Sequence, residues 1–175
     1  MSPAAPERLI LSLLDTPIGP MAFACDAEGR VRGASFGQGL ERSTRRAWPA
    51  ATATGGPLPP EVRAGLEAYF AGEAGALARI AWSLDGAAAG DGFQMRVWRA
   101  LAEIPAGVTI SYGEMAKRAG EPGAAQAAGV ALNRNPIPLV LPCHRVVGAD
   151  GAMVGFGGGL ERKTWLLRHE GALLI

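Results

Sequence analysis

The chain has 175 residues, of which 49% are hydrophobic, and its formal net charge at pH 7 is +1. This length and apolar content suffice for one ordinary domain or two small ones with a proper core. A charge so close to zero gives no overall attraction to nucleic acid, so DNA binding would have to come from a local element. The sequence shows no signal peptide and no apolar run long enough to span a bilayer, which predicts a cytoplasmic protein.

The first half of the chain alternates apolar and polar residues in short runs. Three strands are predicted, with turns between them at 16–20 and 26–29, and together they indicate a small antiparallel sheet over 8–14, 21–25 and 30–36. Residues 50–60 are rich in Ala, Thr, Gly and Pro and are predicted to be a loop. Pro60 can begin a helix that carries Val62, Leu66, Tyr69 and Phe70 on one face. Residues 81–92 form a second predicted loop, which divides the chain into domains at 1–86 and 91–175.

The second half has a helical pattern. Apolar residues at 93, 97, 101 and 104 predict a core helix that ends before Pro105. Ser111 and Glu114 fit a capping box at the start of a short helix that runs through Ala119 and ends at Gly120. A second helix is predicted over 123–134 after a turn of three or four residues, which is the spacing of a helix-turn-helix. The predicted fold class is α+β: a small N-terminal antiparallel sheet with a helix, joined to a mainly helical C-terminal domain.

Small residues give this second helix a face made of Ala124, Ala125, Ala127, Ala128 and Gly129. Such a face can approach a nucleic-acid groove closely, and it can equally pack against neighbouring helices. The pattern by itself leaves both interpretations open, with packing the more common case.

A thiol and an imidazole stand side by side at Cys143 and His144, between an apolar run and a Gly-rich tail. A neighbouring imidazolium lowers the pKa of a thiol, so we expect His144 to help ionise Cys143 as a nucleophile. Residues 139–141 are predicted to be a buried strand, on which successive side chains point to opposite faces. Either the chain bends sharply after Pro142, or a water carries the proton from the sulfur to His144. A carboxylate should orient the imidazole, and Glu170 is the candidate.

The remaining motifs indicate less specific roles. Cys25 lies in a strand-like stretch and is expected to be a small buried hydrophobe. His144 and His169 are the only histidines, and no Cys or His pair has the spacing of metal ligands, so we expect no metal and no cofactor. The glycines over 155–159 lack the spacing of a nucleotide-binding loop and are interpreted as a flexible flap over a pocket.

The segment Pro-Cys-His-Arg-Val-Val-Gly at 142–148 resembles the active-site motif of the O6-alkylguanine-DNA alkyltransferases, the methylated-DNA protein-cysteine methyltransferases. The resemblance is dense over 91–171 and thinner before it, where 15–20 is similar to the family's opening strand and turn. Other stretches that resemble the family pattern, in its order, are 93–98, 104–105, 111–114, 133–136, 155–163 and 165–167.

The resemblance implies direct repair of DNA, in which Cys143 takes the alkyl group from O6 of guanine and keeps it, one turnover per molecule. It leaves O4-alkylthymine open as a second substrate. Double-stranded DNA would be bound through the minor groove by a monomer, and the damaged base would be flipped out of the stack. The catalytic residues it implies are Cys143, His144, Glu170 and Tyr112, the last a phenol that can protonate the base. The DNA- and base-binding residues it implies are Ala125, Gln126, Ala127, Gly129, Arg134, Asn135, Val146, Phe156 and Gly157, among which Asn135 ties the hinge before the active-site segment.

Two positions depart from the family pattern. Gln126 stands where the family usually has an arginine that fills the gap left by the flipped base, and Phe156 stands where relatives often have tyrosine. Glutamine brings no charge and a shorter side chain, so the expected consequence is weaker extrusion of the lesion and slower repair.

Two alternatives compete with the alkyltransferase. A lesion-binding damage sensor would explain Gln126, but such proteins replace the nucleophile, and Cys143 is present. A cysteine hydrolase would use Cys143 and His144, but it would have no use for a helix-turn-helix.

Overall fold

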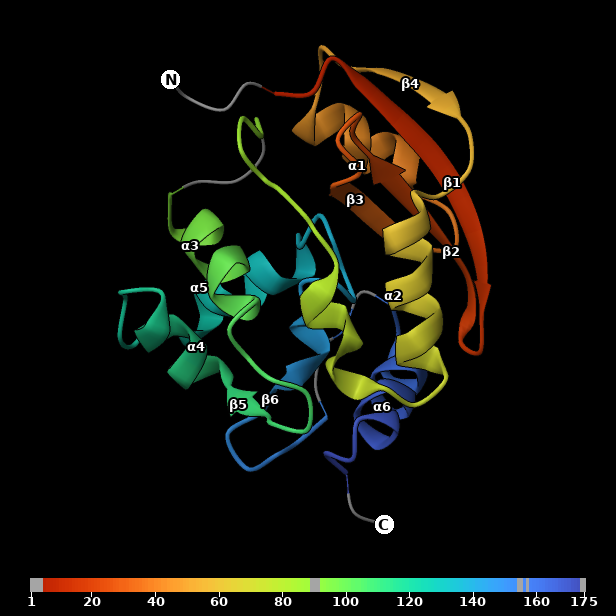
Figure 1. Cartoon of the computed structure of the whole chain (residues 1–175). Helices are drawn as coiled ribbons and strands as arrows, with labels where there is room; N and C mark the ends of the chain where they lie inside the picture. The colour runs from red at the N-terminus through yellow and green to blue at the C-terminus, as the bar shows by residue number, and fades with distance from the viewer. Residues whose placement is uncertain (1–4, 89–91, 154–155, 157, 174–175) are drawn as a thin grey trace. The chain divides into compact units, whose positions relative to one another are not determined.

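The computed structural model describes residues 5–88, 92–153, 156 and 158–173 (Figure 1). The chain divides into two compact units, and the predicted α+β class is confirmed. The first unit comprises Met1–Ala89 together with Pro136–Val140, and the second comprises Gly90–Asn135 and Leu141–Ile175. The predicted domains, 1–86 and 91–175, assign 136–140 to the second half, and that division stays a prediction.

The first unit is built on a four-stranded sheet of order β3-β2-β1-β4. Strands β1 (Arg8–Thr16), β2 (Gly19–Cys25) and β3 (Val31–Phe36) are antiparallel neighbours, as predicted. The fourth strand, β4 (Thr52–Gly55), runs parallel to β1 within the stretch predicted to be a loop, so that prediction is wrong there. All four β4 residues are exposed. The sequence shows no alternation in β4 because the strand forms by pairing with the free edge of β1 rather than by burying side chains.

Helices complete the first unit. Helix α1 (Leu40–Ala47), which the sequence analysis did not predict, buries Leu40, Thr44 and Ala47. Its core cluster joins strand and helix residues, namely Leu9, Ala22, Ala24, Leu40, Ala47 and Trp48. Helix α2 (Pro60–Phe70) begins at Pro60 as predicted and buries Val62, Leu66 and Tyr69, and a 3-10 helix, η1 (Ala74–Arg79), follows it.

The second unit is mainly helical. Helix α3 (Gly92–Leu101) buries Val97, Trp98 and Leu101, and the Trp98 indole donates to the carbonyl of Ala131 over 2.7 Å. The other helices are α4 (Tyr112–Arg118), α5 (Ala125–Asn133) and α6 (Leu160–His169). Two short parallel strands, β5 (Ile110–Ser111) and β6 (Val146–Val147), connect the helix-turn-helix to the active-site segment.

The predicted cap of α4 is half confirmed. The amide of Glu114 donates to the Ser111 hydroxyl over 3.1 Å, whereas the Glu114 carboxylate accepts from Arg118 instead of returning to the cap. The connection to α5 spans 119–124 and is longer than predicted. Helix α5 begins two residues late because Gly123 has φ 87°, which is outside the helical region.

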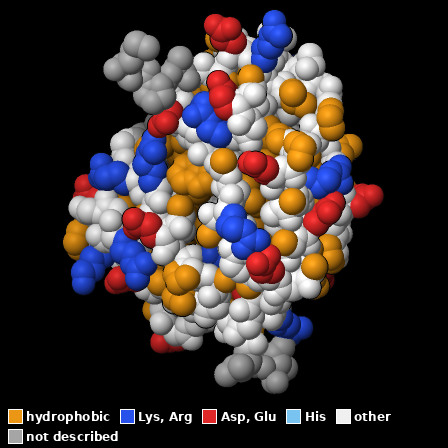
Figure 2. Space-filling view, viewed as in Figure 1, with side chains coloured by type: hydrophobic (Ala, Val, Ile, Leu, Met, Phe, Trp, Pro, Cys, Tyr) orange, Lys and Arg blue, Asp and Glu red, His pale blue; other side chains and the backbone are white. Residues whose placement is uncertain are grey.

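The surface in view carries cations and anions interspersed (Figure 2). Within the described residues, no helix combines the length and the apolar character needed to cross a bilayer.

Candidate active site

The predicted strand over 139–141 is absent, although its residues are buried. Leu139 has φ 78°, and the chain turns there because Pro138 and Pro142 restrict the backbone and remove two N–H donors. Residues Cys143–Arg145 form one 3-10 turn, η2, in which the Arg145 amide donates to the carbonyl of Pro142 over 3.0 Å. The chain therefore bends after Pro142, as one of the two alternatives required.

His144 and Glu170 form a buried pair. Nε2 of His144 lies 2.8 Å from Oε2 of Glu170, and both side chains are fully buried. Glu170 caps the C-terminus of α6, which brings it back to η2 from 26 residues away. The structure thus places the carboxylate where the sequence analysis expected it.

Arg145 completes this cluster from the opposite side. Its Nε and Nη2 atoms donate to the two carboxylate oxygens of Glu170 over 2.8 and 2.9 Å, and its Nη1 donates to the carbonyl of Ile104. Burial raises the pKa of Glu170, but the hydrogen bonds from His144 and Arg145 outweigh burial and lower that pKa to about 2. The carboxylate is therefore ionised at neutral pH.

The second ring nitrogen of His144 is free. Nδ1 is buried and makes no hydrogen bond among the described residues. Burial lowers the pKa of His144, and although Glu170 opposes this effect, the net direction is downward. A neutral imidazole that donates from Nε2 to an ionised carboxylate carries its lone pair on Nδ1, so Nδ1 can accept a proton.

The pKa directions of the two side chains run against a charged imidazole that ionises Cys143 in advance, and the catalytic roles of Cys143 and His144 stay predictions. Burial raises the pKa of the Cys143 thiol, against the opposing effects of a hydrogen bond from Asn135, the charge of Lys163 and two backbone amides. His144 acts on this pKa through its backbone amide, and the pKa of its own imidazole is lowered by burial. The thiol is therefore protonated at rest, because a fully buried site disfavours both charged forms.

Lys163 is the site residue that the sequence analysis missed as a functional group. Its side chain is fully buried in α6, its Nζ donates to the carbonyl of Val146 over 2.7 Å, and its charge acts on Cys143. A signal was present in the sequence: Lys163, Leu166, Leu167 and Glu170 have the spacing of one helix stripe, and a lysine on an inward stripe is unusual.

Asn135 and Tyr112 also adjoin the thiol. The Asn135 amide donates to the carbonyl of Leu141 over 2.8 Å and so ties the end of α5 to the turn before Cys143. Burial raises the pKa of the half-buried Tyr112, and the charge of Cys143 raises it further. Gly129 of α5 faces this ring, and a Cβ there would lie 3.8 Å from Cε1 of Tyr112, an ordinary van der Waals distance.

Part of the small-residue face of α5 packs inward and part of it is exposed, so each of the two interpretations fits some of its residues. Ala128 and Ala131 are buried and pack inward, whereas Gln126, Ala127 and Arg134 are exposed. Ala125, Gly129 and Phe156 are partly exposed, Val146 is buried in β6, and Gly157 lies outside the described residues. No cluster of three His, Cys, Asp or Glu side chains that could hold a metal occurs in the described part of the chain.

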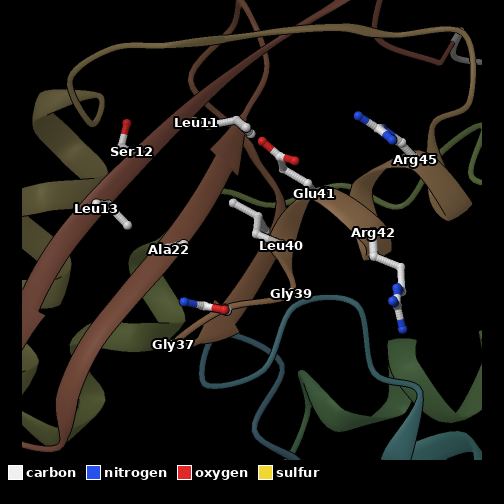
Figure 3. Close-up of a pocket in the computed structure, with 11 residues that line it drawn as sticks. Leu11, Ser12, Leu13, Ala22, Gly37, Gly39, Leu40, Glu41, Arg42 and Arg45 are labelled. Carbon is white, nitrogen blue, oxygen red and sulfur yellow. The ribbon is translucent and has the colours of Figure 1, made fainter.

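A separate pocket of about 880 Å³ lies in the first unit (Figure 3). Figure 3 shows Leu11, Leu13 and Ala22 on the strands, with Leu40 of α1 pointing toward them and Arg42 pointing away. Its one hydroxyl, on Ser12, donates to the carbonyl of Gly56 over 2.6 Å, and its lining includes no Cys or His. The cluster around Cys143 is therefore the candidate for covalent chemistry.

Comparison with known proteins agrees with this assignment. Residues 92–172 match the family model described as 6-O-methylguanine DNA methyltransferase, DNA binding domain. A methylated-DNA–protein-cysteine methyltransferase of Mycobacterium leprae is 45% identical over 90% of this chain and 89% of its own length. One of Shigella flexneri is 39% identical over 96% and 99%. The structure of Mycobacterium tuberculosis OGT in complex with DNA matches with a TM-score of 0.74 at 38% identity, over 93% of this chain and 92% of that chain. The chain therefore belongs to the methylated-DNA–protein-cysteine methyltransferase family.

Proposed function

We propose that this protein repairs DNA by direct reversal, moving the alkyl group from O6 of guanine to Sγ of Cys143, once per molecule. The observation that carries the proposal is that Nδ1 of His144, the residue that follows Cys143, has no hydrogen-bond partner among the described residues, while Nε2 of the same ring lies against the buried Glu170 carboxylate. Family membership and the names of the relatives support the same reaction.

The first step activates the thiol. A water between Sγ and Nδ1 carries the proton of Cys143 to His144, since no residue in the described part of the chain hydrogen-bonds to Nδ1. The ionised Glu170 stabilises the imidazolium that forms, and Arg145 keeps Glu170 ionised. Lys163 and Asn135 stabilise the developing thiolate, which burial otherwise disfavours.

The second step is a displacement at carbon. The bond between sulfur and the alkyl carbon forms while the bond between that carbon and O6 breaks, and the electron pair remains on the base. Tyr112 donates its phenol proton to a ring nitrogen and is reprotonated from solvent, while the His144 imidazolium releases to solvent the proton that it took from the thiol, so the base gains one proton and the thiol loses one overall. The product thioether is stable to water, which makes the reaction stoichiometric.

The second unit provides the DNA-binding surface in this proposal. Helices α4 and α5 form the helix-turn-helix, and the residues assigned to the minor groove are Ala125, Gln126, Ala127, Gly129 and Arg134, on or beside the outer side of α5. The flipped base would meet the carbonyl of Val146, Phe156 and the amide of Gly157, with the Val146 carbonyl keeping one lone pair free of Lys163. A cytoplasmic location fits a reaction that needs both DNA and a reduced thiol.

The test incubates the protein with a duplex that contains O6-methylguanine and then maps its peptides by mass. We expect the peptide containing Cys143 to gain one methyl group, and a Cys143→Ser variant to gain none. Tight binding without a mass change would indicate a damage sensor instead, and neither binding nor mass change would contradict DNA repair altogether. A parallel duplex with O4-methylthymine establishes whether that lesion is also a substrate.

A further inference from the structure

Helix α5 carries one large apolar side chain on its exposed face. Val130 is 45% exposed, while Ala128, Ala131 and Leu132 of the same helix are buried. At about 100° per residue, Gln126, Val130 and Arg134 lie within one arc with Val130 at its middle, nearly opposite Ala128. Val130 is therefore the apolar side chain that projects furthest along the outward direction of the helix.

The rest of this face suits a narrow groove. The minor groove of B-DNA is about 6 Å wide, whereas a helix with ordinary side chains is about 10–12 Å across. Ala127 and Gly129 keep the neighbouring surface of α5 low, and Arg134 places a cation at its C-terminal end. A helix with this profile approaches the groove with its backbone close and sets the methyl groups of Val130 against the base-pair edges.

The chemistry of the groove floor makes Val130 selective. An A·T pair shows only acceptors in the minor groove, while a G·C pair adds the N2 amino donor of guanine. The valine side chain has no hydrogen-bond acceptor. When its methyl groups cover the N2 amino group of guanine, that amino group loses its hydrogen bond to water and gains no other.

We propose that Val130 is a specificity-determining contact that favours repair of lesions flanked by A·T over those flanked by G·C. The inference rests on the proposed function, because it requires α5 to lie in the minor groove during repair. Gln126 and Asn133 are also exposed on α5 and can hydrogen-bond in the groove, so substitution at Val130 isolates the apolar contribution.

The test measures single-turnover methyl transfer from three duplexes that differ only in the pairs beside the lesion: A·T, G·C or inosine·C. Inosine lacks the N2 amino group and otherwise keeps the guanine edges. We expect A·T and inosine·C to react at similar rates and G·C about fivefold more slowly.

The matched variant is Val130→Thr, which keeps the shape of the side chain and supplies a hydrogen-bond acceptor. It should reduce the gap, which is the ratio of the rate on the A·T-flanked duplex to that on the G·C-flanked duplex, to less than twofold. Val130→Ala, which removes the covering methyl groups, should narrow it as well. Val108→Thr makes the same change at another exposed valine, 42% exposed, and should leave the gap intact. Equal rates for the wild type on all three duplexes, or a gap unchanged in Val130→Thr, overturn the inference while the proposed function stands. No methyl transfer to Cys143 from any duplex overturns the proposed function and the inference together.

Discussion

The imidazole of His144 lies 2.8 Å from the carboxylate of Glu170, with neither side chain exposed to solvent. Arg145 donates to the same carboxylate, so the buried Glu170 is paired with a guanidinium and also binds the imidazole of His144, the proposed proton acceptor. The imidazole of His144 is therefore oriented by Glu170 but still neutral, so that it can accept a proton from the thiol of Cys143.

Replacement of Glu170 by Gln should destabilise the fold and slow repair. The variant leaves the buried guanidinium of Arg145 without its counter-charge, which costs about 3–5 kcal/mol. Urea unfolding measures the loss, and Glu67→Gln is the matched control, since its ion pair with Arg63 is exposed and contributes less than about 1 kcal/mol. Equal losses for the two variants would contradict the role of the buried cluster.

Stability should fall as the pH drops below neutrality, in two stages. The folded state keeps His144 neutral below its ordinary pKa of 6.5, so the unfolded chain gains a proton there that the folded chain does not. Glu170 adds a second loss between about pH 4.5 and its folded pKa of about 2. Each group contributes a slope of at most about 1.4 kcal/mol per pH unit.

The first stage can be assigned to His144 by substitution. His144→Gln removes the group that titrates, so its free energy of unfolding should change less between pH 7 and 5.5 than that of the wild type. Denaturant titrations at several pH values measure both slopes. A parallel decline in the two proteins would show that another group is responsible.

In the protein without DNA, the charge of Lys163 should increase the reactivity of the Cys143 thiol by lowering its pKa. Lys163→Met removes the cation that lowers the pKa of the thiol, so alkylation of Cys143 by iodoacetamide should require higher pH. The pH profile of the reaction measures the shift, with Lys117→Met, an exposed residue of α4, as control. An unshifted profile in Lys163→Met would exclude an electrostatic role for Lys163.

The parts of this site that could be predicted from the sequence are those that depend on local residue patterns. The Cys143–His144 pair is a local motif, and helical spacing places Glu170 on an inward stripe of α6. Tertiary context decided the rest. The pairing of β4 with β1 depends on a strand that is distant in the sequence. Burial, which no motif reports, reverses the expected ionisation of Cys143 and gives Lys163 its role.

Gln126→Arg should strengthen binding to alkylated duplex and speed repair. Flipping a base costs a few kcal/mol, and an inserted cationic side chain offsets part of this cost, so we expect a gain of about fivefold or more in the single-turnover rate. Gln126 is exposed on the first turn of α5, so the change should leave the fold intact. No gain in rate or affinity would refute the account of this position.

The central claim is that Cys143 permanently captures the alkyl group, and a count of turnovers tests it most directly. The protein is mixed with a large excess of duplex containing O6-methylguanine, and the guanine formed per protein molecule is followed until the reaction stops. The account predicts one repaired lesion per molecule, with every Cys143 methylated at the end. Continued repair beyond one lesion per molecule, or complete repair with the Cys143 thiol unmodified, would contradict it.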